Sequence, residues 1–150
     1  MPRRHLRALE TWLMRRLILD SDVLLFGFGA PHRWQAHTKR IIVAAERREL
    51  ELHLSVEALQ EFLFHRMRRT PRGLALAQLR TVEDIAHAHP FDAAVWQRTR
   101  HLIATTSIRG RDAIHAATAL EHGFTEIVTG DEAFAAVPGL TPVTPDRLNL

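Results

Sequence analysis

Two acidic residues directly follow apolar segments of the chain. Asp20 ends the wholly apolar run of residues 17–19, and Asp131 comes just after a second apolar run at residues 124–129. Short runs of this kind are typical of strands that are buried on both faces of a sheet. Because ligands of open α/β sheets bind beyond the carboxyl ends of the strands, the two carboxylates are candidates for one shared site.

Two further acidic residues lie on predicted helices. Asp112 opens a helix predicted over residues 112–122, and Glu61 lies inside a helix that Ser55 caps. Four carboxylates that converge repel one another, and a bound cation is what lets them stay ionised together. Mg²⁺ and Mn²⁺ prefer such oxygen ligands, and two of these ions can hold a phosphodiester, activate a water and stabilise the leaving oxygen. The set therefore predicts metal-dependent phosphodiester hydrolysis.

Each of these acidic residues, taken alone, also has a structural interpretation. Asp112 suits the positive end of a helix dipole, and Asp131 could cap the short helix that follows it. Glu61 could lie on a solvated helix face, and periodicity does not prefer it over Glu57. Asp20 is the hardest to explain structurally, because an apolar strand leads directly into it.

Strand and helix patterns alternate along the chain. This alternation predicts a parallel sheet with helices on both faces. Gly27, Gly29 and Pro31 predict a loop, as do Thr70, Pro71 and Gly73. The predicted strands cover residues 17–19, 51–54, 124–129 and 140–143, and the predicted helices cover residues 33–48, 55–68, 74–88, 92–105, 112–122 and 131–136.

The composition narrows the class of protein. A chain of 150 residues favours a single domain, and the absence of cysteine excludes disulfides, thiolate metal sites and cysteine nucleophiles. No apolar run is long enough for a membrane span and no secretory signal is visible, so we expect a cytoplasmic protein without a membrane partner. The basic residues are almost all arginine, whose planar guanidinium group suits phosphates. This composition is compatible with binding to nucleic acid.

An arginine-rich extension precedes the first predicted strand. It covers residues 1–16, and its apolar residues follow a helical spacing. Met14 is an alternative start of the chain. The apolar residues with helical spacing are Leu6, Leu9, Trp12 and Leu13.

The four acidic segments together resemble the PIN-domain family, and within it the VapC-like toxins. The first is LILDSDVL at residues 17–24, and the second is SVEALQEF at residues 55–62. The third is RDAIHAATA at residues 111–119, and the fourth is IVTGDEAF at residues 127–134. The order and spacing of the third and fourth segments make the resemblance fairly specific.

The resemblance implies a fold, an activity and a set of partners. It implies a three-layer α/β/α fold with a central, mainly parallel sheet over residues 17–150, and endonucleolytic cleavage of RNA with Mg²⁺ or Mn²⁺. It also implies a homodimer and inhibition by a cognate antitoxin protein. The residues that would hold the metal and carry catalysis are Asp20, Glu61, Asp112 and Asp131.

Other residues near these segments have less specific roles. Ser21 could hydrogen-bond a ligand at the strand end, and Arg109 and Arg111 could contact RNA phosphates. Asp22 departs from the family, which usually has a neutral polar residue there, and it is a candidate secondary ligand.

The ten histidines show no known metal-ligand spacing. His65 and His115 lie one turn after Glu61 and Asp112, and we expect packing or surface roles for both. His87 and His89 belong to no recognisable pattern.

Two alternative functions remain open at the level of sequence. In a haloacid-dehalogenase-like phosphatase, Asp20 would be the nucleophile and Asp22 the acid–base. Such enzymes need a basic residue in the middle of the chain, whereas the only lysine, Lys39, comes early. The other alternative is a catalytically silent PIN-like binding module.

Overall fold

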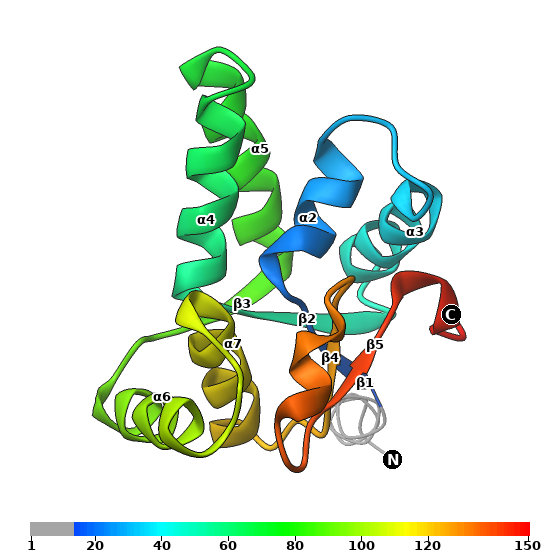
Figure 1. Ribbon diagram of the computed structural model, residues 1–150. Coiled ribbons are helices and arrows are strands. Elements are labelled where there is room, and N and C mark those ends of the chain that lie inside the picture. The colour runs from blue at the N-terminus through cyan, green and yellow to red at the C-terminus, as the bar shows by residue number, and fades with distance from the viewer. Residues whose placement is uncertain (1–13) are drawn as a thin grey trace, which may run out of the picture.

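Parallel strand pairs form the centre of the molecule (Figure 1). The computed structural model describes residues 14–150. Three strands form one sheet in the order β1-β2-β3, and two more form a second sheet. A parallel bridge between Leu19 and Val128 joins the sheets, so the combined order is β3-β2-β1-β4-β5. The strands are β1 (Arg15–Ile18), β2 (Leu50–Ser55), β3 (Ala86–His89), β4 (Glu126–Val128) and β5 (Thr141–Val143).

Helices cover both faces of this sheet, as the alternating pattern predicts. Leu17 and Leu19 point into an apolar core with the first four helices, whereas Ile18 points into a second core with the last two. The first four are α2 (Ser21–Phe28), α3 (Gln35–Glu46), α4 (Val56–Met67) and α5 (Arg72–Ile85). The last two are α6 (Ala93–Thr105) and α7 (Gly110–Glu121). The three-layer α/β/α architecture is therefore confirmed.

Local signals set several of the element boundaries. The Ser55 hydroxyl accepts a hydrogen bond from the Ala58 N–H at 3.0 Å, which makes it the predicted N-cap of α4. Gly123, with a φ of 78°, turns the chain just after α7. The short helix predicted after Asp131 is a 3₁₀ helix, η1 (Glu132–Ala136), and a second one, η2 (Pro145–Arg147), follows β5.

Three predictions about the elements were wrong. The predicted loop at Gly27 is the last part of α2, where a Cβ on Gly27 would lie 3.0 Å from Thr38 Cγ2 of α3. The glycine thus serves close packing of two helices rather than a turn. The helix predicted to reach residue 88 ends at Ile85, because Ala86–His89 pairs with β2 as strand β3. Gly73, predicted to break a helix, lies in the first turn of α5.

The N-terminal extension lies mostly outside the described residues. The amphipathic helix predicted from Leu6 to Leu13 falls there, and the division at residue 17 stays a prediction. Arg15 and Arg16 already belong to β1, in which Arg15 pairs with Leu50 of β2. Within residues 14–150, no helix combines the length and apolar character needed to cross a bilayer.

Candidate functional site

Asp20 lies at the seam between the two sheets, directly after β1. Its backbone N–H donates to the Val128 carbonyl of β4 at 2.9 Å. Its carboxylate accepts hydrogen bonds from the Ser21 N–H at 2.7 Å and from the Thr129 hydroxyl at 2.8 Å. Burial raises the pKa of Asp20 above its ordinary value, although His115 and these hydrogen bonds favour the ionised form. Asp20 is therefore a rigid, buried carboxyl group at the C-terminal end of a strand.

Glu61 reaches the same edge from the second turn of α4. The Ser21 hydroxyl donates to Glu61 Oε2 at 2.5 Å, and His115 Nε2 lies 3.3 Å from the same carboxylate. Arg111 Nε approaches it at 3.9 Å from the start of α7. Burial alone would raise the pKa of Glu61, but the hydrogen bonds from His115 and Ser21 bring it below its ordinary value. Glu61 is thus an ionised carboxylate in a fixed orientation.

Asp112 and His115 come from one face of α7, three residues apart. Ligand atoms of Asp20, Asp112 and His115 all lie within 4.8 Å of one another. Burial, followed by the charges of Asp20 and Asp131, raises the pKa of Asp112 to about 6. His115 is buried, yet contact with Glu61 and the charge of Asp20 raise its pKa above the usual value. The group therefore concentrates negative charge in a partly buried place.

Asp131 lies at the rim of this group. Its N–H donates to the Thr129 hydroxyl at 3.0 Å, and that hydroxyl donates to Asp20. Asp131 Oδ1 accepts from the Ala133 N–H at 2.9 Å and so caps η1, which was the structural interpretation of this residue. The side chain is exposed, and its charge still contributes to the raised pKa of Asp112.

Asp22 lies beside this group in the first turn of α2. Its Oδ2 accepts from the Gly130 N–H at 2.9 Å, whereas its Oδ1 is buried without a hydrogen-bond partner. Burial and the nearby charge of Asp20 raise the pKa of Asp22 to about 7. Asp22 thus joins α2 to the segment after β4 and keeps one buried oxygen atom unpaired.

The donor set fits a hard divalent cation. Carboxylate oxygens from three separated segments meet here, and their mutual repulsion contributes to the raised pKa values of Asp22 and Asp112. A cation among them would remove this repulsion, and Mg²⁺ and Mn²⁺ prefer such oxygen ligands. The unpaired Oδ1 of Asp22 is a further buried acceptor in the same region.

The remaining predicted site residues are placed less centrally. The Ser21 hydroxyl is engaged by Glu61, so it orients a carboxylate in this structure. Arg109 is exposed at the N-cap of α7, and the side chain of Arg111 is 53% exposed. His65 has its Nδ1 buried without a partner, and burial, followed by the charges of nearby arginines, lowers its pKa.

Two residues of the site were not identified from the sequence. His115, expected to have a packing or surface role, contacts Glu61 and lies 3.8 Å from Asp20, while its Nδ1 is 2.7 Å from the Ser55 hydroxyl. Its position three residues after Asp112 was the available signal, because that spacing places both side chains on one helix face. Thr129 had no comparable signal, since its partner Asp20 is 109 residues away.

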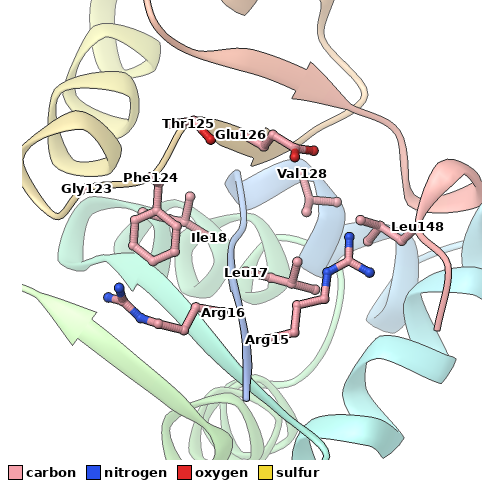
Figure 2. A pocket seen from close by; sticks show the side chains of 10 residues that line it. All are labelled: Arg15, Arg16, Leu17, Ile18, Gly123, Phe124, Thr125, Glu126, Val128 and Leu148. Atoms are coloured by element: carbon pink, nitrogen blue, oxygen red, sulfur yellow. The ribbon is translucent and has the colours of Figure 1, made fainter. Parts of the chain in front are cut away.

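A separate hollow lies away from these carboxylates. A cavity of about 210 Å³ lies along β1, beside Arg15, Arg16 and Phe124 (Figure 2). Its described lining includes Glu126 but none of the four predicted acidic residues. A second hollow of about 340 Å³ lies beside Thr129 and Asp131, with Arg147 on its wall.

Comparison with known proteins identifies the family. The family model described as the PIN domain matches residues 17–140. The chain belongs to the PIN-domain family. This PIN domain is 31% identical over 137 residues to Ribonuclease VapC7 of Mycobacterium tuberculosis, a match that covers 89% of this chain and 94% of the relative. The resemblance to VapC-like members is therefore confirmed, and the phosphatase alternative has no support.

Solved structures share the PIN fold. VapBC2 of Rickettsia felis, bound to a DNA fragment from its promoter, superposes with a TM-score of 0.69 at 13% identity, covering 86% of this chain and 98% of the other. Mycobacterium tuberculosis VapC20, described as a sarcin–ricin-loop-cleaving toxin, superposes with a TM-score of 0.65 at 15% identity, covering 80% and 93%.

Proposed function

We propose that this PIN domain is a Mg²⁺- or Mn²⁺-dependent endoribonuclease and the toxin of a toxin–antitoxin pair. The observation that carries the proposal is the meeting of Asp20, Asp112 and His115 within 4.8 Å, with Glu61 hydrogen-bonded to the same histidine. The kinship with Ribonuclease VapC7 supports RNA as the substrate.

The four acidic residues would share the work of holding the ion. Asp20, Glu61 and Asp112 supply carboxylate oxygens from three elements, and Asp131 supplies one from the rim. A divalent cation bound there would hold the phosphodiester and lower the pKa of the attacking water. Within the protein, Ser21 and His115 keep Glu61 ionised and oriented. Thr129 and the Ser21 N–H orient Asp20 and oppose the rise in its pKa that burial causes.

We call the carboxylates of Asp20, Glu61, Asp112 and Asp131 the acidic edge. Basic groups around the acidic edge would bind the RNA backbone. Arg109 and Arg111 lie at the start of α7, and Arg147 lines the hollow beside Asp131. Contacts of this kind hold phosphates without regard to base sequence. Ser21 would contribute to the site by orienting Glu61 through its hydrogen bond, without contacting a phosphate itself.

Similarity to known toxin–antitoxin proteins supports the partners that we propose. Solved structures with this fold include a VapBC complex from Salmonella typhimurium and a toxin–antitoxin complex from Klebsiella pneumoniae. By this kinship we propose a cognate antitoxin, a homodimer and action in the cytoplasm. Co-purification with the product of the adjacent upstream open reading frame tests the antitoxin, and its absence from a pull-down would count against it.

Paired variants test the proposed activity. Asp20→Asn and Asp112→Asn should each abolish Mg²⁺-dependent cleavage of RNA, because each removes a charged ligand while keeping the side-chain size. Asp84→Asn is the matched control, since Asp84 is exposed near the end of α5 and its variant should cleave normally. Circular dichroism checks that all three variants are folded.

Two results would contradict the proposal. Full activity of either site variant would remove that residue from the mechanism. Weak or absent Mn²⁺ binding in calorimetry, together with no cleavage by the wild type, would favour the silent binding module instead.

A further inference from the structure

A second group of titratable side chains, separate from the acidic edge, lies around strands β2 and β3. Glu51 and His53 are two residues apart on β2, so they share one face of the sheet. His53 is directly opposite His87 of β3 in the parallel register, which places the two side chains side by side. Four of the chain's ten histidines meet here in ring contact: His53, His87, His89 and His122.

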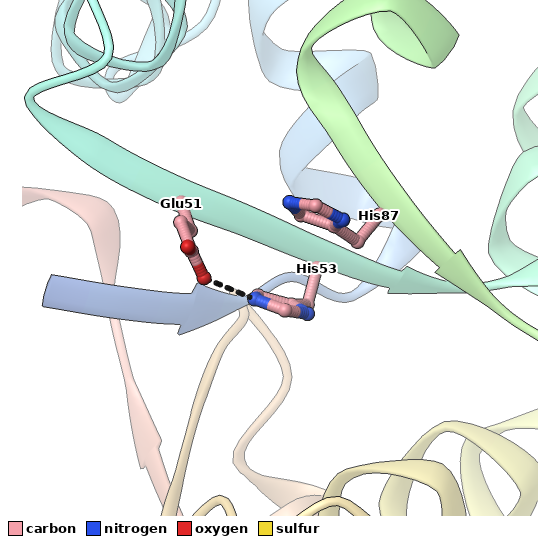
Figure 3. Close-up of side chains that lie close together, drawn as sticks. All are labelled: Glu51, His53 and His87. Carbon is pink, nitrogen blue, oxygen red and sulfur yellow. Dashed lines mark hydrogen bonds and ion pairs between the residues drawn. The ribbon is translucent and has the colours of Figure 1, made fainter. Parts of the chain in front are cut away.

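Three of these side chains have the spacing of metal ligands. One ligand atom each of Glu51, His53 and His87 lies within 4.8 Å of the other two (Figure 3). His53 Nε2 is 3.2 Å from Glu51 Oε2, and the rings of His53 and His87 are stacked with centroids 4.9 Å apart. A metal ion lies in the plane of each imidazole that binds it, so the His87 ring must turn out of the stack to share an ion with His53. His53 is buried whereas His87 is exposed, which leaves His87 room for this rotation.

The other ring nitrogen of His53, Nδ1, lies within hydrogen-bond distance of a neighbouring histidine. Nδ1 of His53 lies 2.8 Å from Nε2 of His89, and His89 in turn stacks on His122 with centroids 3.8 Å apart. Histidine ligands of metals commonly donate their second N–H to a fixed neighbour, which leaves the first nitrogen free to bind. With Nδ1–H donated to His89, the lone pair of His53 Nε2 faces Glu51.

The positively charged side chain of Arg16 lies beside the ligand atoms of His53 and Glu51. The Arg16 Nε–H donates to His53 Nε2 at 3.4 Å, and Arg16 Nε lies 3.7 Å from Glu51 Oε2. These are the two atoms that would bind a metal ion. The side chain of Arg16 is 47% exposed, so it can move into solvent when an ion takes its place.

We propose that Glu51, His53 and His87 form a binding site for a transition metal of the zinc class. Two imidazoles and one carboxylate suit Zn²⁺, Ni²⁺ or Cu²⁺, whereas Mg²⁺ prefers oxygen ligands alone. The ion would tie β2 to β3 and would be separate from the cation of the acidic edge.

Zinc titration of the full chain tests this site. The assay is calorimetry with Zn²⁺, with Co²⁺ absorption as the readout of imidazole ligation. The wild type should bind Zn²⁺ in an event that survives Asp112→Asn, because that variant affects only the acidic edge. His87→Gln should weaken the event by about tenfold or more, since it removes one ligand from an exposed position.

Two more variants sharpen the test. His101→Gln is the matched control, because His101 is an exposed histidine of α6 outside the cluster, and it should bind as the wild type does. Arg16→Gln should bind Zn²⁺ more tightly than the wild type, because the competing guanidinium is gone. The proposal is overturned if calorimetry of the wild type detects no Zn²⁺ binding with a dissociation constant below about 100 micromolar. It is equally overturned if Asp112→Asn abolishes the event while His87→Gln leaves it unchanged.

Discussion

Individual residues of the acidic edge are held by partners that are distant in sequence. The sequence offered Asp20, Asp112 and Asp131 as candidates because strand ends and helix starts are local features. Glu61 was chosen over Glu57 by the resemblance to the PIN-domain family. The sequence did not identify His115 or Thr129, whose contacts depend on how α7 and β4 pack against β1. It also left the Ser21 hydroxyl open to a ligand, although that group is bonded to Glu61 across 40 residues. Hydrogen-bond partners of this kind are products of the tertiary fold.

Replacement of His115 tests its role as a positioning residue. His115→Gln should lower the affinity for Mn²⁺ by about 10–100-fold, because Glu61 loses a hydrogen bond that keeps it ionised and oriented. The measurement is RNA cleavage as a function of Mn²⁺ concentration, with His101→Gln as the control. A purely structural role would lower the melting temperature and leave the Mn²⁺ dependence unchanged.

Asp22 makes stability depend on pH in a defined direction. Its pKa is about 7 in the fold, against an ordinary value of 3.8. The protonated form therefore favours the folded state, and this contribution is complete below pH 3.8 and is lost as the pH rises to about 7. Without metal, Asp22→Asn should melt about 3 °C or more above the wild type at pH 8, with a smaller difference at pH 5. A constant difference across this range would contradict the assignment.

Elements were predicted well where the local pattern agrees with the tertiary pairing. The helices α4, α6 and α7 follow apolar periodicity and recognisable caps, and the structure has them within a few residues of the predicted bounds. Strand β3 was missed because Ala86–His89 continues the pattern of α5, and only pairing with β2 makes it a strand. Helix α2 was missed because Gly27 inside it and Gly29 just after it resemble a turn.

A glycine after β4 tests how the elements position the acidic edge. A Cβ on Gly130 would lie 2.7 Å from Trp34 Cζ3 and 2.9 Å from Phe26 Cζ, so Gly130→Ala must displace either these rings or the segment that carries Asp131. We expect a loss of about 1–3 kcal/mol in the free energy of unfolding and reduced cleavage. Gly73→Ala in α5 is the control: its Cβ would meet nothing within 4 Å, and it should be neutral or stabilising. Chemical denaturation of both variants measures the difference, and equal stability would contradict this packing argument.

At the scale of the whole molecule, the sheet has two separate apolar cores and one crowded acidic edge. Both cores were predictable in outline, because alternating strands and helices imply layers on each face. The narrow join between the two sheets was not predictable, since the strand pairing there is a single bridge within residues 14–150, between Leu19 and Val128. The position of that join decides which residues meet at the edge.

Metal binding should stabilise the whole fold, and more so at higher pH. Mn²⁺ at about a hundred times its dissociation constant would add roughly 2.7 kcal/mol to the free energy of unfolding. The shift in melting temperature should shrink between pH 8 and pH 5, because Asp112, with a pKa of about 6, takes up protons there and competes with the ion. Thermal melts with and without Mn²⁺ measure it, and Asp112→Asn should show a smaller shift. An equal shift at both pH values would contradict the acidic edge as the binding place.

The join between the sheets gives the acidic residues a second task. Three bonds fasten residues 20–22 to residues 128–130: the Asp20 N–H to the Val128 carbonyl, the Thr129 hydroxyl to Asp20, and the Gly130 N–H to Asp22. Two of these bonds end on the carboxyl groups of Asp20 and Asp22. Cation binding and the attachment of the two sheets to each other therefore depend on the same carboxyl groups. Hydrogen exchange at the Asp20 and Gly130 amides should consequently slow when a cation binds. The exchange rates of these two amide protons would therefore report whether the acidic edge holds a cation.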